Sequence, residues 1–307
     1  AADMIEEAYR LAPNDIDVLE NAGVVWQNLG ESERATRALR HAVELAPLNL
    51  ISRGYLGLLL GFVLVQGAQR LNLQLLTQLP PPPGFSTGGI ANAIVGTILV
   101  CAIATILSLP LGVLAAVYLA EFSHNNRLSR WVRFATNVLS GVPSIIAGVF
   151  IYGLLVQTGL TGFSAVAGGA ALAVLMLPTI IRTTDDALQL VPDDLRWASM
   201  GAGASNYETV FRVVLPTSAS AIATGVTLAI ARAAGETAPL IFTALFSPFW
   251  PESLFEPIAT LSVLVYNFAI VPFKAQQELA WAGSLILILL VLCTNIVARW
   301  VTRTQRF

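Results

Sequence analysis

Long apolar stretches separated by short polar connections are the feature that most restricts how this chain folds. Five of them reach the length of about 20 residues that a helix needs to cross the hydrocarbon of a bilayer. Charged residues make up only 12% of the chain, whereas soluble domains carry about 25%. The sequence therefore predicts an all-α, polytopic membrane protein with spans at residues 90–120, 132–157, 163–184, 217–245 and 279–301.

A shorter apolar stretch at residues 54–67 brings the prediction to about six transmembrane helices. Because this stretch is marginal in length, we expect its helix to extend toward Leu76, with Arg70 reaching to the membrane surface. Pro110 predicts a kink in the second span, and the sequence Gly-Val-Pro-Ser at residues 141–144 interrupts the third.

Residues 1–49 differ in character from the rest of the chain. One and a half repeats bury too little for a stable solenoid, so this segment is either a truncated array or packs on a partner. The predicted domains are a cytoplasmic, tetratricopeptide-like helical segment at 1–49 and a transmembrane domain at 50–307. The residues that match the tetratricopeptide pattern are Leu19, Gly23, Trp26, Ala35, Leu39, Ala42 and Pro47.

The polar segment 190–216 lies between the fourth and fifth apolar spans. Its charges and unpaired backbone groups exclude it from hydrocarbon. We expect a short helix, a turn at Gly203 and a second helix that starts near Pro216. Small side chains from Ala198 to Ala204 let another protein approach the backbone closely, which is typical of a docking element.

This segment resembles the cytoplasmic loop of ABC-importer permeases. That loop reads Glu-Ala-Ala, three residues, Gly, nine residues, Ile, one residue, Leu-Pro. In the family it is the coupling helix that docks into the ATP-hydrolysing subunit, and the resemblance implies the same role here; the alternative is an ordinary amphipathic loop. The residues at matching positions are Trp197, Ala198, Ser199, Gly203, Val213, Leu215 and Pro216, with Trp replacing Glu and Ser replacing the second Ala.

Positive charge predicts the orientation of the spans, because lysine and arginine are retained on the cytoplasmic side. In a six-span arrangement Arg70 and Lys274 fall on one side, and Arg182 and Arg232 lie within spans. Both termini and segment 190–216 are therefore predicted to be cytoplasmic. They share that side with Arg10, Arg34, Arg37, Arg40, Arg53, Arg127, Arg130, Arg133, Arg196, Arg212, Arg299, Arg303 and Arg306.

The two arginines within spans are candidate pathway residues, since an arginine in a span costs about 2.5 kcal/mol or more on insertion scales. Arg232 lies roughly 24 Å along the fifth helix from Pro216, and Glu236 follows one turn later on the same face. The alternative for this pair is an internal ion pair that only joins helices. Arg182 lies nearer the cytoplasmic edge with Asp185 on the next turn, and its alternative role is an interfacial anchor.

Four stretches of the apolar part of the chain carry a family resemblance: Gly89–Glu121, Ser140–Tyr152, Leu177–Leu188 and Ala231–Ala244. Through them, residues 54–307 resemble the phosphate-transporter permeases of the PstA type, which have the type I ABC importer fold. In that family an Arg-x-x-Glu pair on the fourth helix and an arginine on the fifth are associated with phosphate translocation. The resemblance places these roles on Arg182, Asp185 and Arg232, with Asp185 where glutamate is usual.

The chemistry of these residues suits an oxyanion. Guanidinium groups offer paired donors that match phosphate oxygens. Neighbouring carboxylates such as Glu236 compete for the arginines and so prevent binding that is too tight for conduction. Sulfate satisfies the same arginines, so this chemistry alone does not choose between the two anions.

ATP hydrolysis is assigned to another subunit, because the only lysine, Lys274, follows Phe273 and no Walker A motif exists. The two cysteines, Cys101 and Cys293, lie in apolar spans, and the only histidines are His41 and His124, so no metal site is predicted. No cofactor is predicted in this chain; ATP and magnesium belong to the ATPase. The predicted protein is a phosphate permease subunit of the bacterial inner membrane. Its predicted partners are the lipid bilayer, a second permease, two ATPase subunits and a periplasmic phosphate-binding protein, with no nucleic acid.

Two other functions stay open at this point. One is a permease for another oxyanion or small solute, which uptake assays with phosphate and sulfate would separate from a phosphate permease. The other is a membrane scaffold that recruits soluble partners through residues 1–49; two arginines inside spans argue against a simple anchor.

Overall fold

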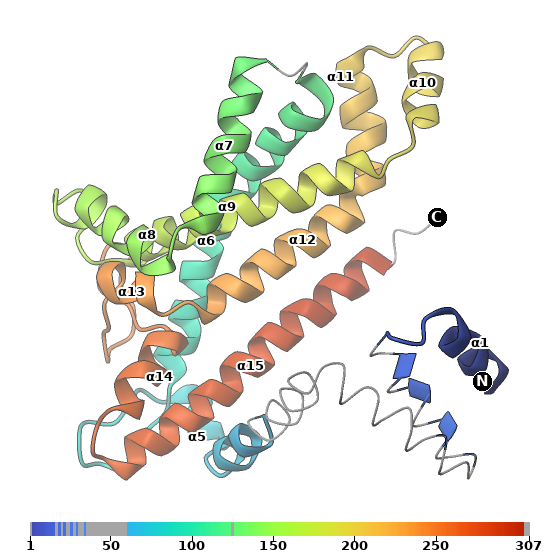
Figure 1. Cartoon of the computed structure of the whole chain (residues 1–307). Helices are drawn as coiled ribbons and strands as arrows, with labels where there is room; N and C mark the ends of the chain where they lie inside the picture. Colours follow the sequence, from blue (N-terminus) through green and yellow to red (C-terminus); the bar gives the residue numbers. More distant parts are fainter. Residues whose placement is uncertain are drawn as a thin grey trace. The chain divides into compact units, whose positions relative to one another are not determined.

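The computed structural model describes residues 2–15, 60–123 and 126–303, together with residues 18, 19, 21, 22, 25, 26, 29 and 34. The chain divides into two units, residues 1–65 and 66–307. Within the described residues, every regular element is a helix, and the all-α prediction is confirmed (Figure 1).

The first unit contains helix α1, Ala2–Leu11. Ile5 and Tyr9 of α1 pack on a buried cluster formed by Leu19, Ala22 and Trp26, and the rings of Tyr9 and Trp26 meet edge to face at 5.1 Å between centroids. Most of the tetratricopeptide pattern lies outside the described residues, so the repeat stays a prediction.

Among the described residues of the second unit, four long helices qualify as membrane spans by length and composition. They are α6 (Ala91–Val117), which continues through Pro110 into the π-helical turn η1 (Tyr118–Phe122); α9 (Ala165–Gln189); the helix that ends in α12 (Leu215–Gly235); and α15 (Lys274–Arg303). Helix α9 packs against both α6 and α12, and α12 packs against α15 (Figure 1). Glycines make this packing close: a side chain at Gly169 of α9 would overlap Ile103 of α6.

The third predicted span is broken where the sequence indicates. Helix α7 (Arg127–Gly141) and helix α8 (Ser144–Ile151), which continues as the π-helical turn η2 (Tyr152–Val156), meet at a bend of 108°. Pro143 lies in the break, where its ring and missing N–H prevent the helix from continuing. Counting this pair as one span gives up to five candidate spans in the described part of the second unit; the first predicted span is described only from residue 60.

The first predicted helix does not extend to Leu76. It ends at residue 68, and Asn72 caps a separate short helix, α5 (Leu73–Thr77), by accepting a hydrogen bond from the Leu75 N–H. Arg70 forms an ion pair with Glu278 of α15 at 2.6 Å and donates to the Ser86 carbonyl at 2.8 Å. Arg70 is therefore held by a carboxylate of α15, and its predicted position at the membrane surface stays a prediction.

The fifth predicted span differs from expectation at both ends. The chain is already helical from α11 (Asn206–Thr209) through the π-helical segment η3 (Val210–Val214), so Pro216 lies in the first turn of α12 but does not start the helix. A wider π turn precedes the proline, which cannot donate to the carbonyl four residues earlier.

At its other end, α12 stops at Gly235, before the predicted end at residue 245. Glu236 is the C-cap with extended backbone angles, and a separate helix, α13 (Ala238–Thr243), follows. Pro239 explains the stop, because a continuous helix would need its absent N–H and would press its ring on the Gly235 carbonyl. Helix α14 (Leu261–Ala269) then lies in the loop before α15.

Gly96 of α6 offers a test of the packing. An added Cβ there would overlap the carbonyl oxygen of Ala259, which is backbone and cannot turn away. We expect Gly96→Ala to destabilise the protein by about 1–3 kcal/mol, measured as a lower unfolding midpoint in detergent. Gly153→Ala is the matched control, because its Cβ would meet no atom within 4 Å; equal midpoints for the two variants would contradict the packing.

Candidate functional site

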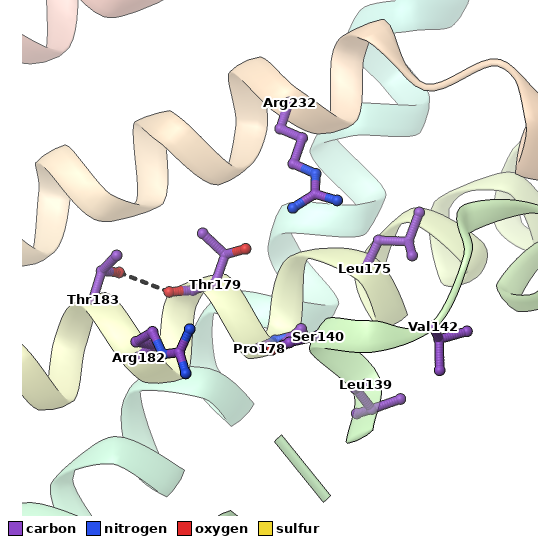
Figure 2. Close-up of a pocket in the computed structure, with 9 residues that line it drawn as sticks. All are labelled: Leu139, Ser140, Val142, Leu175, Pro178, Thr179, Arg182, Thr183 and Arg232. Carbon is purple, nitrogen blue, oxygen red and sulfur yellow. Dashed lines mark hydrogen bonds between the residues drawn. The ribbon is translucent and has the colours of Figure 1, made fainter. Parts of the chain in front are cut away.

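A cavity of about 310 Å³ lies between the α7–α8 break, α9 and α12 (Figure 2). Two arginines from different helices, Arg182 of α9 and Arg232 of α12, line it. Figure 2 shows Arg232 reaching from α12 toward α9. The remaining lining residues are Leu139, Ser140, Val142, Leu175, Pro178, Thr179 and Thr183. The structure thus brings together the two arginines that the sequence places within spans.

Close packing of α9 and α12 fixes the spacing of these arginines. Gly225 of α12 lies directly on the side chain of Thr183, and any Cβ at Gly225 would overlap it. Arg182 is next to this contact, whereas Arg232 lies seven residues beyond it, roughly 10 Å along the helix. The backbone positions of the two arginines that line the cavity are therefore offset along α12.

Arg232 lies within the candidate span Asn206–Gly235, as predicted, but near its end and not in its middle. It lies in the last turn of α12, and its side chain is 63% exposed in this chain. Its Nε is 3.7 Å from Oε1 of Glu236, which is too long for a hydrogen bond. No hydrogen bond of its guanidinium is found among the described residues, so its donors are available to a ligand.

Asp185 does not pair with Arg182. Its Oδ2 accepts a hydrogen bond from Nη1 of Arg133 on α7 at 3.0 Å. The side chain of Arg182 has no hydrogen bond or ion pair within the part of the chain that the structure describes. Sequence reasoning missed Arg133, which it counted only among the cytoplasmic positive charges, because its partner is distant in sequence and only tertiary packing joins them.

The predicted docking element has the expected short helix and turn, but its second helix starts at Asn206 and not near Pro216. Helix α10 (Asp193–Gly201) is followed by a turn in which Gly203 has a φ of 93°, the left-handed region that favours glycine. Trp197 and Ala198 are exposed, and Ser199 Oγ lies 2.9 Å from Thr209 Oγ1, which holds α10 against α11. Gly203 and Pro216 are also exposed and Leu215 is partly buried. None of these six residues lines the arginine cavity, although Leu215 and Pro216 begin α12, the helix that carries Arg232.

A buried ion pair that the sequence did not reveal holds α10 in place. Nη2 of Arg196 lies 2.7 Å from Oε1 of Glu121 in η1, with the two side chains 17% and 9% exposed. Arg196 also donates to the Leu188 carbonyl at the end of α9. Hydrogen bonding to Glu121 raises the pKa of Arg196 above its usual value, so the guanidinium stays charged. Arg196 therefore links α10 to η1 and to the end of α9.

Metal ligands do not cluster in the described part of the chain: no group of three or more His, Cys, Asp or Glu side chains is close enough to hold an ion there. The arginine cavity is suited by its donors to an oxyanion.

The α10–α11 element lies at one end of the second unit, whereas α13 and α14 lie toward the other (Figure 1).

Residues 108–307 match the family model described as the binding-protein-dependent transport system inner membrane component. The phosphate transport system permease protein PstA of Yersinia pestis is 45% identical over 234 residues, covering 76% of this chain and 79% of that protein. The protein of the same description from Haemophilus influenzae is 42% identical over 237 residues, covering 77% and 83%.

Solved structures agree with the fold. The inward-facing MetNI methionine ABC transporter superposes with a TM-score of 0.55 at 21% identity, covering 71% of this chain and 95% of that chain. A bacterial alginate ABC transporter superposes with a TM-score of 0.61 at 13% identity, covering 92% and 98%. The chain belongs to the family of inner membrane components of binding-protein-dependent transport systems, as a relative of the PstA phosphate transport permeases.

Proposed function

We propose that this chain is the transmembrane permease subunit of an ATP-driven importer that translocates inorganic phosphate. One observation carries the proposal: Arg182 and Arg232 line the same cavity between α9 and α12, in a chain that is 45% identical to a phosphate transport system permease protein. Neither guanidinium makes a hydrogen bond within the described residues, so both can offer paired donors to an oxyanion.

The stagger of the two arginines suits passage of an anion. Their positions, roughly 10 Å apart along α9 and α12, let phosphate leave one guanidinium while it approaches the other. Oε1 of Glu236 lies 3.7 Å from Nε of Arg232, so Glu236 can pair with this arginine again when the anion departs. Binding then stays weak enough for release, which conduction requires.

The partners follow from the family and the docking element. A second permease subunit completes the pathway, and a periplasmic phosphate-binding protein delivers the anion. Two ATPase subunits hold ATP and magnesium, and one of them docks on α10 through Trp197, Ala198 and the turn at Gly203. The chain crosses the bacterial inner membrane, with both termini and segment 190–216 in the cytoplasm, and needs no nucleic-acid partner.

Helix α9 connects the docking element to the cavity. It carries Arg182 about 10 Å from its end at Gln189. The Arg196–Glu121 ion pair fastens α10 to η1, and the hydrogen bond from Arg196 to Leu188 fastens it to α9. Rearrangement of the ATPase subunits thereby moves the helices that hold the arginines.

Uptake by the purified complex tests this function. We expect an ATPase and a second permease to co-purify with this chain. Proteoliposomes that contain the complex, with ATP inside and the binding protein outside, should then accumulate radiolabelled phosphate. Accumulation of sulfate but not phosphate would assign the chain to another oxyanion. Purification without an ATPase would favour the scaffold alternative.

A further inference from the structure

A second polar cavity, of about 250 Å³, shares Arg182 with the first. It lies beside Arg133, Thr136 and Asn137 of α7, and beside Asp185 and Gln189 of α9. Asp186 also lines it. Because Asp185 and Gln189 follow Arg182 toward the end of α9 that leads to α10, this cavity lies on the docking-element side of Arg182.

Asp185 in this cavity has an unused hydrogen-bond acceptor. Its side chain is only 10% exposed and pairs with Arg133 through Oδ2, but its Oδ1 is buried with no partner in the described part of the chain. Buried polar atoms are rarely left without a hydrogen bond, since an unsatisfied group costs about 1–3 kcal/mol. The observation points to a donor that arrives with a ligand.

The charges around this cavity also favour a ligand that both accepts and donates hydrogen bonds. The guanidinium groups of Arg133 and Arg182 are matched by the carboxylates of Asp185 and Asp186. An anion without protons would meet attraction from the first two groups and repulsion from the other two. An anion that keeps a proton can donate a hydrogen bond to one carboxylate while its other oxygens accept from the two guanidinium groups.

We propose that this cavity is a second anion site on the phosphate route, where Arg133 and Arg182 hold the oxyanion and Asp185 accepts the hydrogen bond of a P–OH group. The inference rests on the proposed phosphate permease function. Arg133 is half exposed, so it can turn from Oδ2 toward the anion and leave the Asp185 carboxylate free to receive that hydrogen bond.

This arrangement distinguishes phosphate from sulfate, which the arginines alone do not. Near neutral pH phosphate retains at least one proton on oxygen, whereas sulfate retains none. A site built to accept a hydrogen bond rejects an analogue that lacks the donor, because the buried acceptor stays unpaired. Sulfate would in addition place a charged oxygen against the carboxylate.

Equilibrium binding to the complete purified complex, without the binding protein, tests the site. Radiolabelled phosphate is displaced with unlabelled phosphate or sulfate, and the ratio of the two affinities is the readout. We expect wild type to prefer phosphate and Asp185→Asn to reduce the preference by about tenfold or more. Asp185→Glu should keep it, because the carboxylate remains. Arg133→Gln should weaken both anions together and leave the ratio nearly unchanged.

Controls separate this inference from the function on which it rests. Glu256→Gln removes an exposed carboxylate outside the cavity and should not change the ratio. In wild type, arsenate, which keeps a proton, should bind like phosphate, and selenate, which keeps none, should bind like sulfate; this comparison holds even where Asp185→Asn fails to assemble. An unchanged ratio in Asp185→Asn, or selenate binding as well as arsenate, would overturn the site while phosphate uptake stands. A wild-type complex that takes up no phosphate would overturn the proposed permease function itself.

Discussion

We expect Arg232→Gln to lower phosphate uptake by roughly tenfold or more, equivalent to about 1.4 kcal/mol of lost barrier lowering. Glutamine keeps most of the length and a hydrogen-bond donor but removes the charge. Arg232 lies in the last turn of α12 with its side chain 63% exposed, so the loss should not come from unfolding. The measurement is the initial rate of phosphate uptake in proteoliposomes, with yield and ATPase co-purification as checks on assembly.

The matched variants for this prediction separate charge from geometry. Arg232→Lys keeps the charge but loses the planar fork of donors, and we expect uptake between those of wild type and Arg232→Gln. Lys274→Gln removes an exposed positive charge at the start of α15, away from the cavity lining, and should transport normally. Equal losses in Lys274→Gln and Arg232→Gln would indicate a general effect of net charge.

A double variant with Glu236 tests whether Arg232 acts in the pathway or only forms an ion pair that joins helices. If Arg232 served only to neutralise Glu236, then Arg232→Gln would leave a partly buried carboxylate unpaired, and adding Glu236→Gln would restore both stability and uptake. The separation of 3.7 Å between Nε and Oε1 makes that pair weak. We therefore expect the double variant to assemble but to remain defective in uptake. Recovery of uptake would contradict a pathway role for Arg232.

Local sequence signals predicted much of the fold because each of them acts on its own neighbours. Apolar length predicted the spans, since the requirement of about 20 residues is a property of the bilayer. Pro143 marked the bend between α7 and α8, and Gly203 marked the left-handed turn after α10. The end of α12 at Gly235 also has a local cause, which is Pro239. The prediction missed it because residues 217–245 are apolar throughout and so indicated one continuous span.

The site was predictable only in part because ion pairing depends on tertiary contacts. Arg182 and Arg232 stood out because arginines within spans are costly. The partner of Asp185 was not its neighbour Arg182 but Arg133 on another helix. Arg70 with Glu278 and Arg196 with Glu121 follow the same rule: each arginine pairs with a carboxylate far along the chain, which hydropathy and spacing do not reveal.

The second large effect is expected at the docking element, where a bulky charge on α10 should uncouple the importer. Ala198 is the position of choice. It is exposed on a regular helix, and arginine is a good helix former. A side chain at Gly203 would instead strain a turn with a φ of 93°, so a defect there would not separate docking from folding. We expect Ala198→Arg to lower uptake by roughly tenfold or more.

The mechanism of this loss is distinguishable from damage to the pathway. Ala198→Arg leaves the arginine cavity and the Arg196–Glu121 ion pair untouched, so phosphate binding to the membrane subunits should persist at its wild-type affinity. Contact with the ATPase subunit should weaken, seen as lower co-purification and loss of the ATP hydrolysis that the loaded binding protein stimulates. Ala198→Ser, which adds a single oxygen, should behave as wild type. Normal uptake and normal stimulated hydrolysis in Ala198→Arg would show that the ATPase docks elsewhere, because a guanidinium on the exposed face of α10 would have to displace a subunit that docks there.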